Sequence, residues 1–144
     1  REETDRHKRY GHTLSLIIFD IDHFKKYNDT YGHQCGDYVL QTIAELIGKS
    51  IRSGDVLARY GGEEFCCILP ETNLEQALVT AERFRQAVAD YSFRCMQNNI
   101  KLTISLGVSS MGDETSTAEM LLKKADEGLY LAKSKGRNRT EAVR

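Results

Sequence analysis

Residues 56–70 read VLARYGGEEFCCILP, and this stretch decides the fold. Two short strand-forming runs, Val56–Tyr60 and Phe65–Leu69, lie on either side of Gly61-Gly62, which is a strong β-hairpin pattern. Two carboxylates, Glu63-Glu64, follow the glycines directly. Because glycine lacks a Cβ atom, a bulky ligand can approach the backbone there. The stretch therefore predicts a tight hairpin turn that something charged approaches closely.

Hydrophobic spacing on either side of the hairpin predicts the remaining elements. Strand-forming runs predict two more strands, and apolar residues that recur every three or four positions predict helices. The expected elements are a strand over Thr13–Ile21, a short helix over His23–Tyr31, a helix over Gln34–Ile51, a helix capped by Asn73 and running to Tyr91, a strand over Ile100–Val108, and a helix from Ser116 or Thr117 to Lys135-Gly136. Apart from two additional helices, the short one over His23–Tyr31 and the last one, this order predicts an α+β, ferredoxin-like fold, with an antiparallel sheet and helices packed on one face.

Length and charge narrow the class of protein. A chain of 144 residues fits one domain. Its net charge of −1 gives no basic excess for a nucleic-acid backbone, so nucleic-acid binding is not expected. The longest apolar run, Leu14–Phe19, is far shorter than the ~18 residues of a membrane-spanning helix, and no N-terminal signal pattern is visible. The charged first dozen residues are expected to be the tail of a helix or linker from a longer protein.

The four cysteines are Cys35, Cys66, Cys67 and Cys95, and none forms a CxxC pair. Neighbouring strand residues such as Cys66 and Cys67 point to opposite faces. Neither a zinc site nor a disulfide framework is therefore expected, and the cytoplasm is the predicted compartment.

An acidic group is expected where the first strand meets the hairpin. Asp20 ends the first strand and Glu63 lies on the turn, and these two elements are neighbours in the predicted sheet. Like charges brought together are costly unless a cation relieves them. Mg²⁺ held by carboxylates and substrate phosphates fits, and two such ions suit phosphoryl-type transfer. The alternative is that Asp22 only caps the next helix, the glycines only turn and the glutamates are solvated.

Further polar residues are suited to a nucleotide. Asn28 and Asp37 offer the amide and carboxylate groups that address the edge of a guanine, and Lys25 supplies a charge for phosphate. Lys133 and Arg137 follow around a helix end. For this basic pair, phosphate binding and simple compensation of the helix dipole are equally open interpretations.

Five strings resemble one family, the GGDEF domains, which are diguanylate cyclases. They are FDIDHFKKYND, GHQCGD, RYGGEEF, SLGVS and ADEGLYLAKSKGRNR, and the resemblance runs from about Tyr10 to Arg139. It implies a polymerase-palm-like core with an added β-hairpin. It also implies a nucleotidyltransferase that condenses two GTP molecules into cyclic di-GMP and two pyrophosphates, with two Mg²⁺ or Mn²⁺ ions per site, in an antiparallel homodimer.

The resemblance also implies roles for individual residues. The metal ligands would be Asp20, Glu63 and the Ile21 carbonyl, and the catalytic residues would be Glu63 and Glu64. The guanine would be contacted by Asn28, Asp37, Leu40 and Gly62. The phosphates would be contacted by Phe24, Lys25, Lys133 and Arg137. A Glu stands at the third position of the GGEEF motif, which is an accepted form. The family's usual upstream segment, DxLTGLxNRR, is missing, so we expect an N-terminally truncated piece of a longer signalling protein.

A second motif, RSGD over residues 52–55, matches the RxxD pattern that binds the product as an inhibitor in this family. Arg52 and Asp55 would form that site, with Arg83 as an additional arm. The alternatives are a plain turn for RSGD and a solvated helix face for Arg83. Two other functions stay open: a catalytically silent receptor for cyclic di-GMP, and a cyclase making a mixed guanine–adenine product, against which Asp37 argues.

Overall fold

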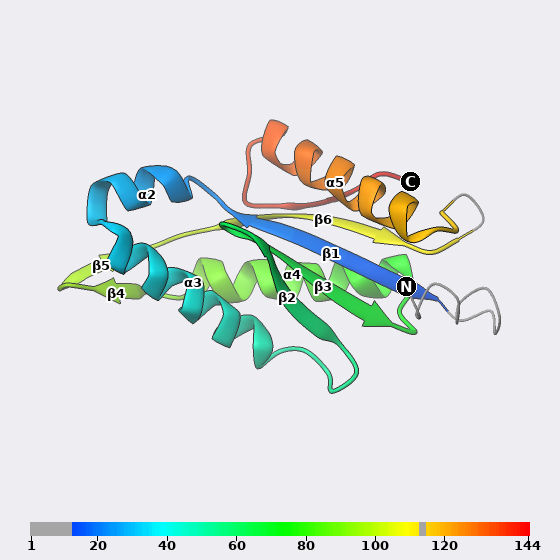
Figure 1. Ribbon diagram of the computed structural model, residues 1–144, viewed down its shortest axis with the longest axis horizontal. Coiled ribbons are helices and arrows are strands. Elements are labelled where there is room, and N and C mark those ends of the chain that lie inside the picture. The colour runs from blue at the N-terminus through cyan, green and yellow to red at the C-terminus, as the bar shows by residue number, and fades with distance from the viewer. Residues whose placement is uncertain (1–12, 113–114) are drawn as a thin grey trace.

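The computed structural model describes residues 13–112 and 115–144. At their centre lies a five-stranded sheet (Figure 1). Its strands, in spatial order, are β2 (Val56–Gly61), β3 (Glu64–Pro70), β1 (Leu14–Ile21), β6 (Ile104–Ser110) and β7 (Thr140–Ala142). Neighbouring strands are antiparallel except for β6 and β7, which are parallel. The predicted hairpin and its place beside the first strand are confirmed. The expectation for residues 1–12 lies outside the described residues.

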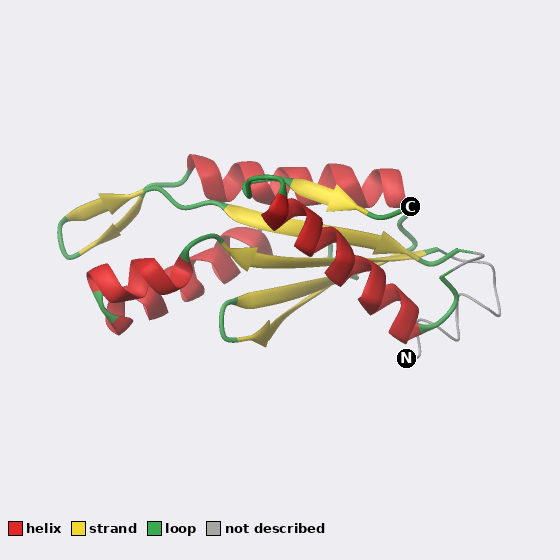
Figure 2. Ribbon diagram, turned by 90° about the horizontal axis from the view of Figure 1, so that it is seen from above, coloured by secondary structure: helices red, strands yellow, loops and turns green. Residues whose placement is uncertain are grey.

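Helices cover both faces of this sheet. They are α2 (Phe24–Tyr31), α3 (His33–Gly48), α4 (Leu74–Asp90) and α5 (Ala118–Ser134). Figure 2 shows α4 and α5 on opposite sides of the strands. Ile17 and Phe19 of β1 join the core formed with α3 and α4, whereas Leu16 and Ile18 pack with residues of α5. The expected α+β class is confirmed. The expectation that helices pack on one face only was wrong, because β1 is buried on both sides.

Two helix starts follow the capping rules on which their prediction rested. The Asn73 side chain accepts a hydrogen bond from the Gln76 amide, and the Gln76 side chain accepts one from the Asn73 amide, which completes a capping box at α4. The Thr117 side chain accepts from the Met120 amide at the start of α5. The two caps therefore fix the residues at which α4 and α5 begin.

The region before β6 differs from the predicted single strand over Ile100–Val108. A second, two-stranded sheet forms from β4 (Phe93–Cys95) and β5 (Asn98–Ile100). Met96 and Gln97 connect these strands with φ values of 52° and 71°, the positive values of a tight hairpin turn. The pair lacks the glycine or asparagine that normally marks such a turn, so the sequence pattern did not reveal it. The three-residue strand β7 was missed because it is too short to show a period.

A disulfide bond joins Cys35 of α3 to Cys95 of β4, so the expectation that the cysteines form no disulfide was wrong. The two residues lie 60 positions apart, and only the packing of α3 against β4 brings them together. Local spacing such as CxxC cannot reveal a tertiary pairing of this kind. Cys66 and Cys67 are free, as two adjacent strand residues would be. None of the described helices has the length and apolarity that crossing a membrane would require.

Candidate functional site

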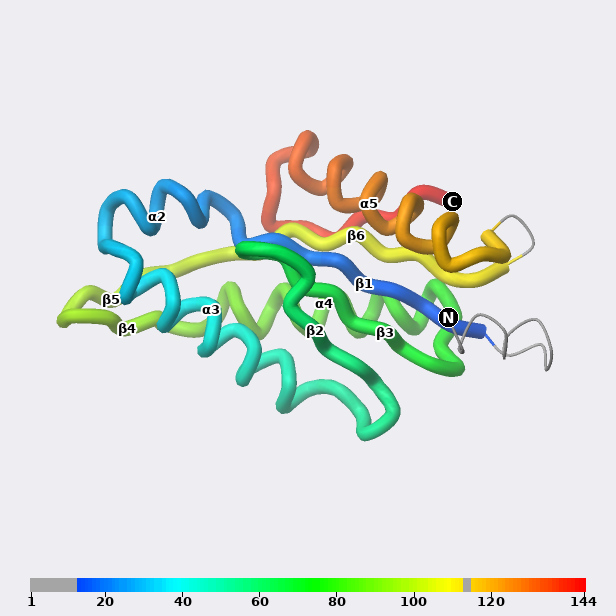
Figure 3. The backbone as a smooth tube through the Cα atoms, in the orientation of Figure 1, coloured from blue at the N-terminus to red at the C-terminus, as the bar shows by residue number. Residues whose placement is uncertain are grey.

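Three carboxylates converge at one end of the sheet. Asp20, near the end of β1, lies directly opposite Glu64 of β3 in the strand register. Glu63 lies on the β2–β3 turn, next to the shift in register between Arg59 and Gly61. One small cavity is lined by Asp20, Tyr60, Gly61, Gly62, Glu63 and Glu64. Figure 3 shows the turn beside the end of β1. The acidic group that the sequence indicated is therefore present.

The electrostatics of this group favour a bound cation. Burial raises the pKa of Glu63, and the nearby Asp20 charge and a hydrogen bond to Asp20 raise it further. Burial and the charge of Asp20 likewise raise the pKa of Glu64, while Lys133 lowers both values. Asp20 Oδ2 is paired with the Lys133 ammonium, but Asp20 Oδ1 is buried without a hydrogen-bond partner. An unsatisfied carboxylate oxygen between two other carboxylates is a suitable ligand for a hard divalent cation.

The donor set also bears on which kind of metal fits. Across residues 13–112 and 115–144, no group of three or more His, Cys, Asp or Glu residues is arranged to hold a metal ion. Mg²⁺ does not require such a cage, since it is usually held by one or two carboxylates together with water and substrate phosphates. Ile21 has a hydrocarbon side chain without a donor atom, so only its backbone carbonyl could serve as a further ligand.

A second cavity, of about 360 Å³, adjoins the cavity of the acidic group, because Gly62 and Glu63 line both. Its volume lies within the range of small-molecule sites, about 300–1,000 Å³. The lining residues are Phe24, Lys25, Asn28, His33, Asp37, Leu40, Arg59, Gly62 and Glu63. All four residues expected at a guanine and two of those expected at phosphate are thus brought together. Asn28 Oδ1 is buried without a hydrogen-bond partner, so this lining residue carries an unsatisfied acceptor.

Two lining residues, His33 and Arg59, were missed. Arg59 donates from Nε and Nη2 to the Gly62 carbonyl, at 2.9 and 2.5 Å, which braces the turn that carries Glu63. Its place inside RYGGEEF, two residues before the glycines, was the available signal. His33 lies inside the GHQCGD string, and nothing in its spacing distinguished it from a solvated residue.

Gly36 makes room for the Asn28 side chain, which leads to a first prediction. A Cβ atom at Gly36 would lie 1.8 Å from Asn28 Oδ1. Gly36→Ala must therefore turn the Asn28 amide out of the cavity. If this cavity binds GTP, as the family resemblance implies, we expect GTP affinity to fall about tenfold, the cost of roughly one well-placed hydrogen bond. The melting temperature should change little, because alanine favours the helix. Calorimetric titration with GTP measures the effect.

The control for this prediction is Gly48→Ala on the same helix, where nothing lies within 4 Å of the new methyl group. That variant should bind GTP as the wild type does. Unchanged GTP affinity in Gly36→Ala would contradict a ligand role for the Asn28 amide.

The basic residues occupy different places. Lys133, in the last turn of α5, reaches Asp20 and so lies at the acidic end of the cleft. Arg137 lies on the loop after α5, and it is not among the described residues that line either cavity.

Asp22 does not cap α2. The N-cap of that helix is His23, which makes no side-chain capping hydrogen bond. The alternative in which Asp22 only caps the next helix was therefore wrong.

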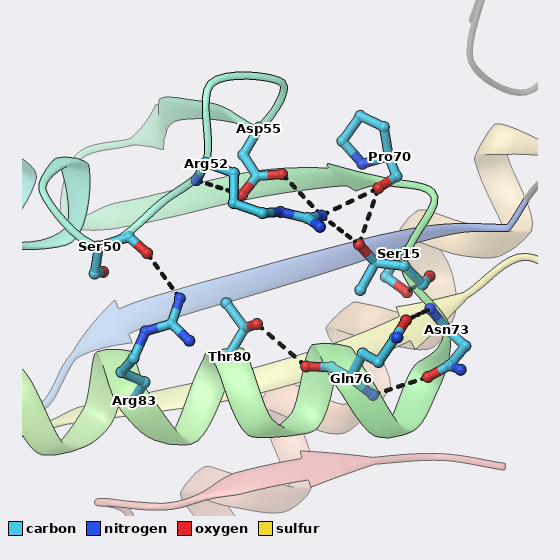
Figure 4. Close-up of polar contacts among 10 residues, drawn as sticks. Ser15, Ser50, Arg52, Asp55, Pro70, Asn73, Gln76, Thr80 and Arg83 are labelled. Carbon is cyan, nitrogen blue, oxygen red and sulfur yellow. Dashed lines mark hydrogen bonds and ion pairs between the residues drawn. The ribbon is translucent and has the colours of Figure 1, made fainter.

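The RSGD segment forms a tight turn whose residues hold one another (Figure 4). The Arg52 amide donates to Asp55 Oδ2 at 2.9 Å, and Arg52 Nη2 donates to Thr72 Oγ1 at 2.8 Å. From α4, Arg83 Nη2 donates to the Ser50 carbonyl at 2.7 Å. Arg52 and Arg83 therefore border the same turn, although Asp55 is largely covered there, with 3% of its side chain exposed.

Comparison with known proteins identifies the family. The family model described as "Diguanylate cyclase, GGDEF domain" matches residues 1–139. The chain belongs to the GGDEF family of diguanylate cyclases. Diguanylate cyclase A of Treponema denticola is 45% identical over 127 residues, which span 88% of this chain and 34% of that protein. Response regulator PleD of Caulobacter vibrioides is 47% identical over 130 residues, which span 89% of this chain and 29% of that protein. The chain thus spans about a third of the length of these relatives.

Solved GGDEF structures share the fold closely. The GGDEF domain of DgcB from Caulobacter crescentus, in complex with c-di-GMP, has a TM-score of 0.92 and 34% identity, covering 97% of this chain and 83% of that one. The active GGEEF domain of a diguanylate cyclase from Vibrio cholerae has a TM-score of 0.90 and 37% identity, covering 96% and 88%. The palm-like fold expected from the sequence is therefore confirmed.

Proposed function

We propose that the chain is a catalytic domain that condenses two GTP molecules into cyclic di-GMP and releases two pyrophosphates. The observation that carries the proposal is a cleft of two adjoining cavities, each lined by a residue with a buried, unpartnered oxygen: Asp20 Oδ1 in the acidic group and Asn28 Oδ1 in the second cavity. A buried polar atom without a partner costs free energy that a ligand can recover. The two atoms call for a cation and a hydrogen-bond donor, which a metal-bound GTP supplies together.

Each part of the cleft has a role in this proposal. Mg²⁺ or Mn²⁺, two per site, would be held by Asp20, Glu63 and the Ile21 carbonyl, and would stabilise the charge that develops during phosphoryl transfer. Glu64 assists by orienting or deprotonating the attacking 3′-hydroxyl. Guanine contacts are Asn28, Asp37, Leu40 and Gly62, and phosphate contacts are Phe24, Lys25, Lys133 and Arg137. Catalysis then comes mainly from placement and electrostatics, with little covalent chemistry by the protein.

The reaction requires a second copy of the domain. Each domain holds one GTP, and the 3′-hydroxyl of each nucleotide must lie in line with the α-phosphate of the other. An antiparallel homodimer with the two clefts facing each other satisfies both requirements. As part of the proposal, we place this domain of a longer signalling protein in the cytoplasm, where GTP is available. The cysteines do not support that placement, because Cys35 and Cys95 form a disulfide.

Chromatography of nucleotides after incubation with GTP, ATP or both, in the presence of Mg²⁺, tests the proposal. We expect cyclic di-GMP from GTP alone and no adenine-containing product. A mixed dinucleotide would instead assign a different base choice, and binding of cyclic di-GMP without any turnover, even with the upstream segment restored, would assign a silent receptor.

Product inhibition through Arg52, Asp55 and Arg83 is the regulatory part of the proposal. Arginine pairs bidentately with phosphate or guanine, and a charged hydrogen bond contributes about 1.5–3 kcal/mol. We therefore expect Arg52→Ala to raise the cyclic di-GMP concentration for half-inhibition at least tenfold, measured from initial rates.

The control is Arg94→Ala, which removes an exposed arginine on β4 and should leave inhibition unchanged. Because Arg52 also bonds Thr72 and the Pro70 carbonyl, a thermal melt must accompany the assay. If a well-folded Arg52→Ala variant were inhibited as strongly as the wild type, the segment would be only a turn.

A further inference from the structure

The loop after α5 has an unusual backbone. Gly136, Arg137 and Asn138 have φ values of 119°, 66° and 49° in succession. Glycine adopts such values freely, but arginine and asparagine do so at a cost in free energy. A strained segment of this kind persists only when the surrounding structure holds it. The loop therefore needs an anchor.

That anchor is the buried carboxylate of Asp22. Its Oδ2 atom accepts hydrogen bonds from the Asn138 amide at 3.0 Å and from Thr103 Oγ1 at 2.6 Å, and its Oδ1 atom accepts one from Ser105 Oγ at 2.7 Å. The Asp22 residue is only 5% exposed. A buried carboxylate that accepts hydrogen bonds from several donors forms a rigid network with them.

Neighbouring contacts hold the loop at further points. The Arg137 amide donates to the Ala132 carbonyl at 2.9 Å, and the Leu106 amide donates to the Arg139 carbonyl at 2.9 Å. From α4, Arg85 Nη1 donates to Asn138 Oδ1 at 2.9 Å. Among these contacts only those of Asp22 come from the residue that directly follows β1, the strand that carries Asp20. Asp22 therefore ties the position of the loop to the position of the acidic group.

We propose that Asp22 is a positioning residue for the triphosphate: it fixes the loop so that Arg137, adjacent to the anchored Asn138 amide, and Lys133, four residues earlier on α5, stay aligned with the acidic end of the cleft. Lys133 is already paired with Asp20 there. Asp22 itself touches no ligand in this arrangement. The inference rests on the proposed function, because it assumes that Lys133 and Arg137 contact phosphate.

The test compares two ligands that share a guanine and differ in phosphate. One is the GTP analogue in which a methylene group replaces the oxygen between the α- and β-phosphates, so that the bond which the reaction would break cannot be cleaved. The other is GMP. Calorimetry with Mg²⁺ measures both dissociation constants. For Asp22→Ala we expect affinity for the triphosphate analogue to fall at least tenfold and affinity for GMP to stay within twofold. Asp22→Asn, which keeps one acceptor oxygen, should restore part of the loss.

Loss of stability alone cannot produce this pattern. Asn73→Ala removes the capping box of α4, far from the loop, and should lower the melting temperature while leaving the ratio of the two affinities unchanged. If Asp22→Ala does not fold, Asp22→Asn carries the test, with a two- to fivefold loss confined to the triphosphate analogue. An unchanged ratio in the folded variants overturns the positioning role. If the wild type bound GMP as tightly as the analogue, the phosphate end of the proposed function would fail first.

Discussion

Glu63→Gln is expected to lower the rate of cyclic di-GMP formation about 10³-fold or more. A metal ion contributes several kcal/mol of charge stabilisation in phosphoryl transfer, and each 1.36 kcal/mol is a factor of ten in rate. Glutamine keeps the shape of Glu63 on the β2–β3 turn but removes one of the two charges proposed to hold the ion. Product formation from GTP and Mg²⁺, followed by chromatography, measures the loss.

The same variant has an expected effect on stability that separates metal binding from misfolding. The pKa of Glu63 is raised in the folded protein, so its contribution to stability is present below the ordinary carboxyl pKa and lost as pH rises through the folded value. At neutral pH the neutral glutamine should therefore be no less stable than metal-free wild type. Added Mg²⁺ should raise the melting temperature of the wild type and not of Glu63→Gln.

The matched control is Glu45→Gln, which removes an exposed carboxylate of α3 away from the cleft. It should leave both turnover and the response to Mg²⁺ unchanged. If Glu63→Gln retained turnover, the proposal that Glu63 is a ligand of the metal ion would be wrong.

The largest expected loss of stability comes from Gly107→Ala. A Cβ atom at Gly107 of β6 would lie 2.0 Å from the Ala125 carbonyl oxygen and 2.2 Å from the Leu129 nitrogen, both in the backbone of α5. Backbone cannot rotate away as a side chain can, so α5 must move off the sheet. We expect a loss of about 3 kcal/mol or more, or roughly 10 °C in melting temperature.

Gly128→Ala, on the facing side of the same contact, should act similarly, since its Cβ atom would lie 2.6 Å from the Glu141 carbonyl oxygen. Gly54→Ala is the control for stability, because nothing lies within 4 Å of its new methyl group. Displacement of α5 should also reduce turnover, because α5 carries Lys133. A melting temperature within 2 °C of the wild type, the shift expected of about 0.5 kcal/mol, would show that α5 does not pack this closely on β6.

The parts of the fold that could be predicted are those specified by neighbouring residues. The hairpin around Gly61-Gly62 and the caps at Asn73 and Thr117 each depend on a few adjacent positions, and all three are where the sequence indicated. Burial on both faces of β1 had a signal in the nearly continuous apolar run Leu14–Phe19, but the ferredoxin-like order favoured helices on one side. The Met96-Gln97 turn had no characteristic residues.

The candidate site divides in the same way. Motif residues such as Asp20, Asn28 and Glu63 were identified from the sequence, and the structure brings them into one cleft. The disulfide between Cys35 and Cys95 and the contacts of Asp22 depend on pairs of residues 60 or more positions apart, which only the folded chain brings together. For Asp22 the neighbouring residues offered only the alternative of a helix cap, because Thr103, Ser105 and Asn138 lie far away in the sequence.

A crystal structure of the domain with the methylene GTP analogue and Mn²⁺, with the ion located by its anomalous scattering, tests the central claim most directly. We predict an anomalous peak within bonding distance of Asp20 and Glu63 oxygens, roughly 2.0–2.2 Å if Mn²⁺ binds much as Mg²⁺ does, with guanine beside Asn28 and Asp37. An ion bound away from these carboxylates, or a triphosphate outside the cleft, would contradict the account.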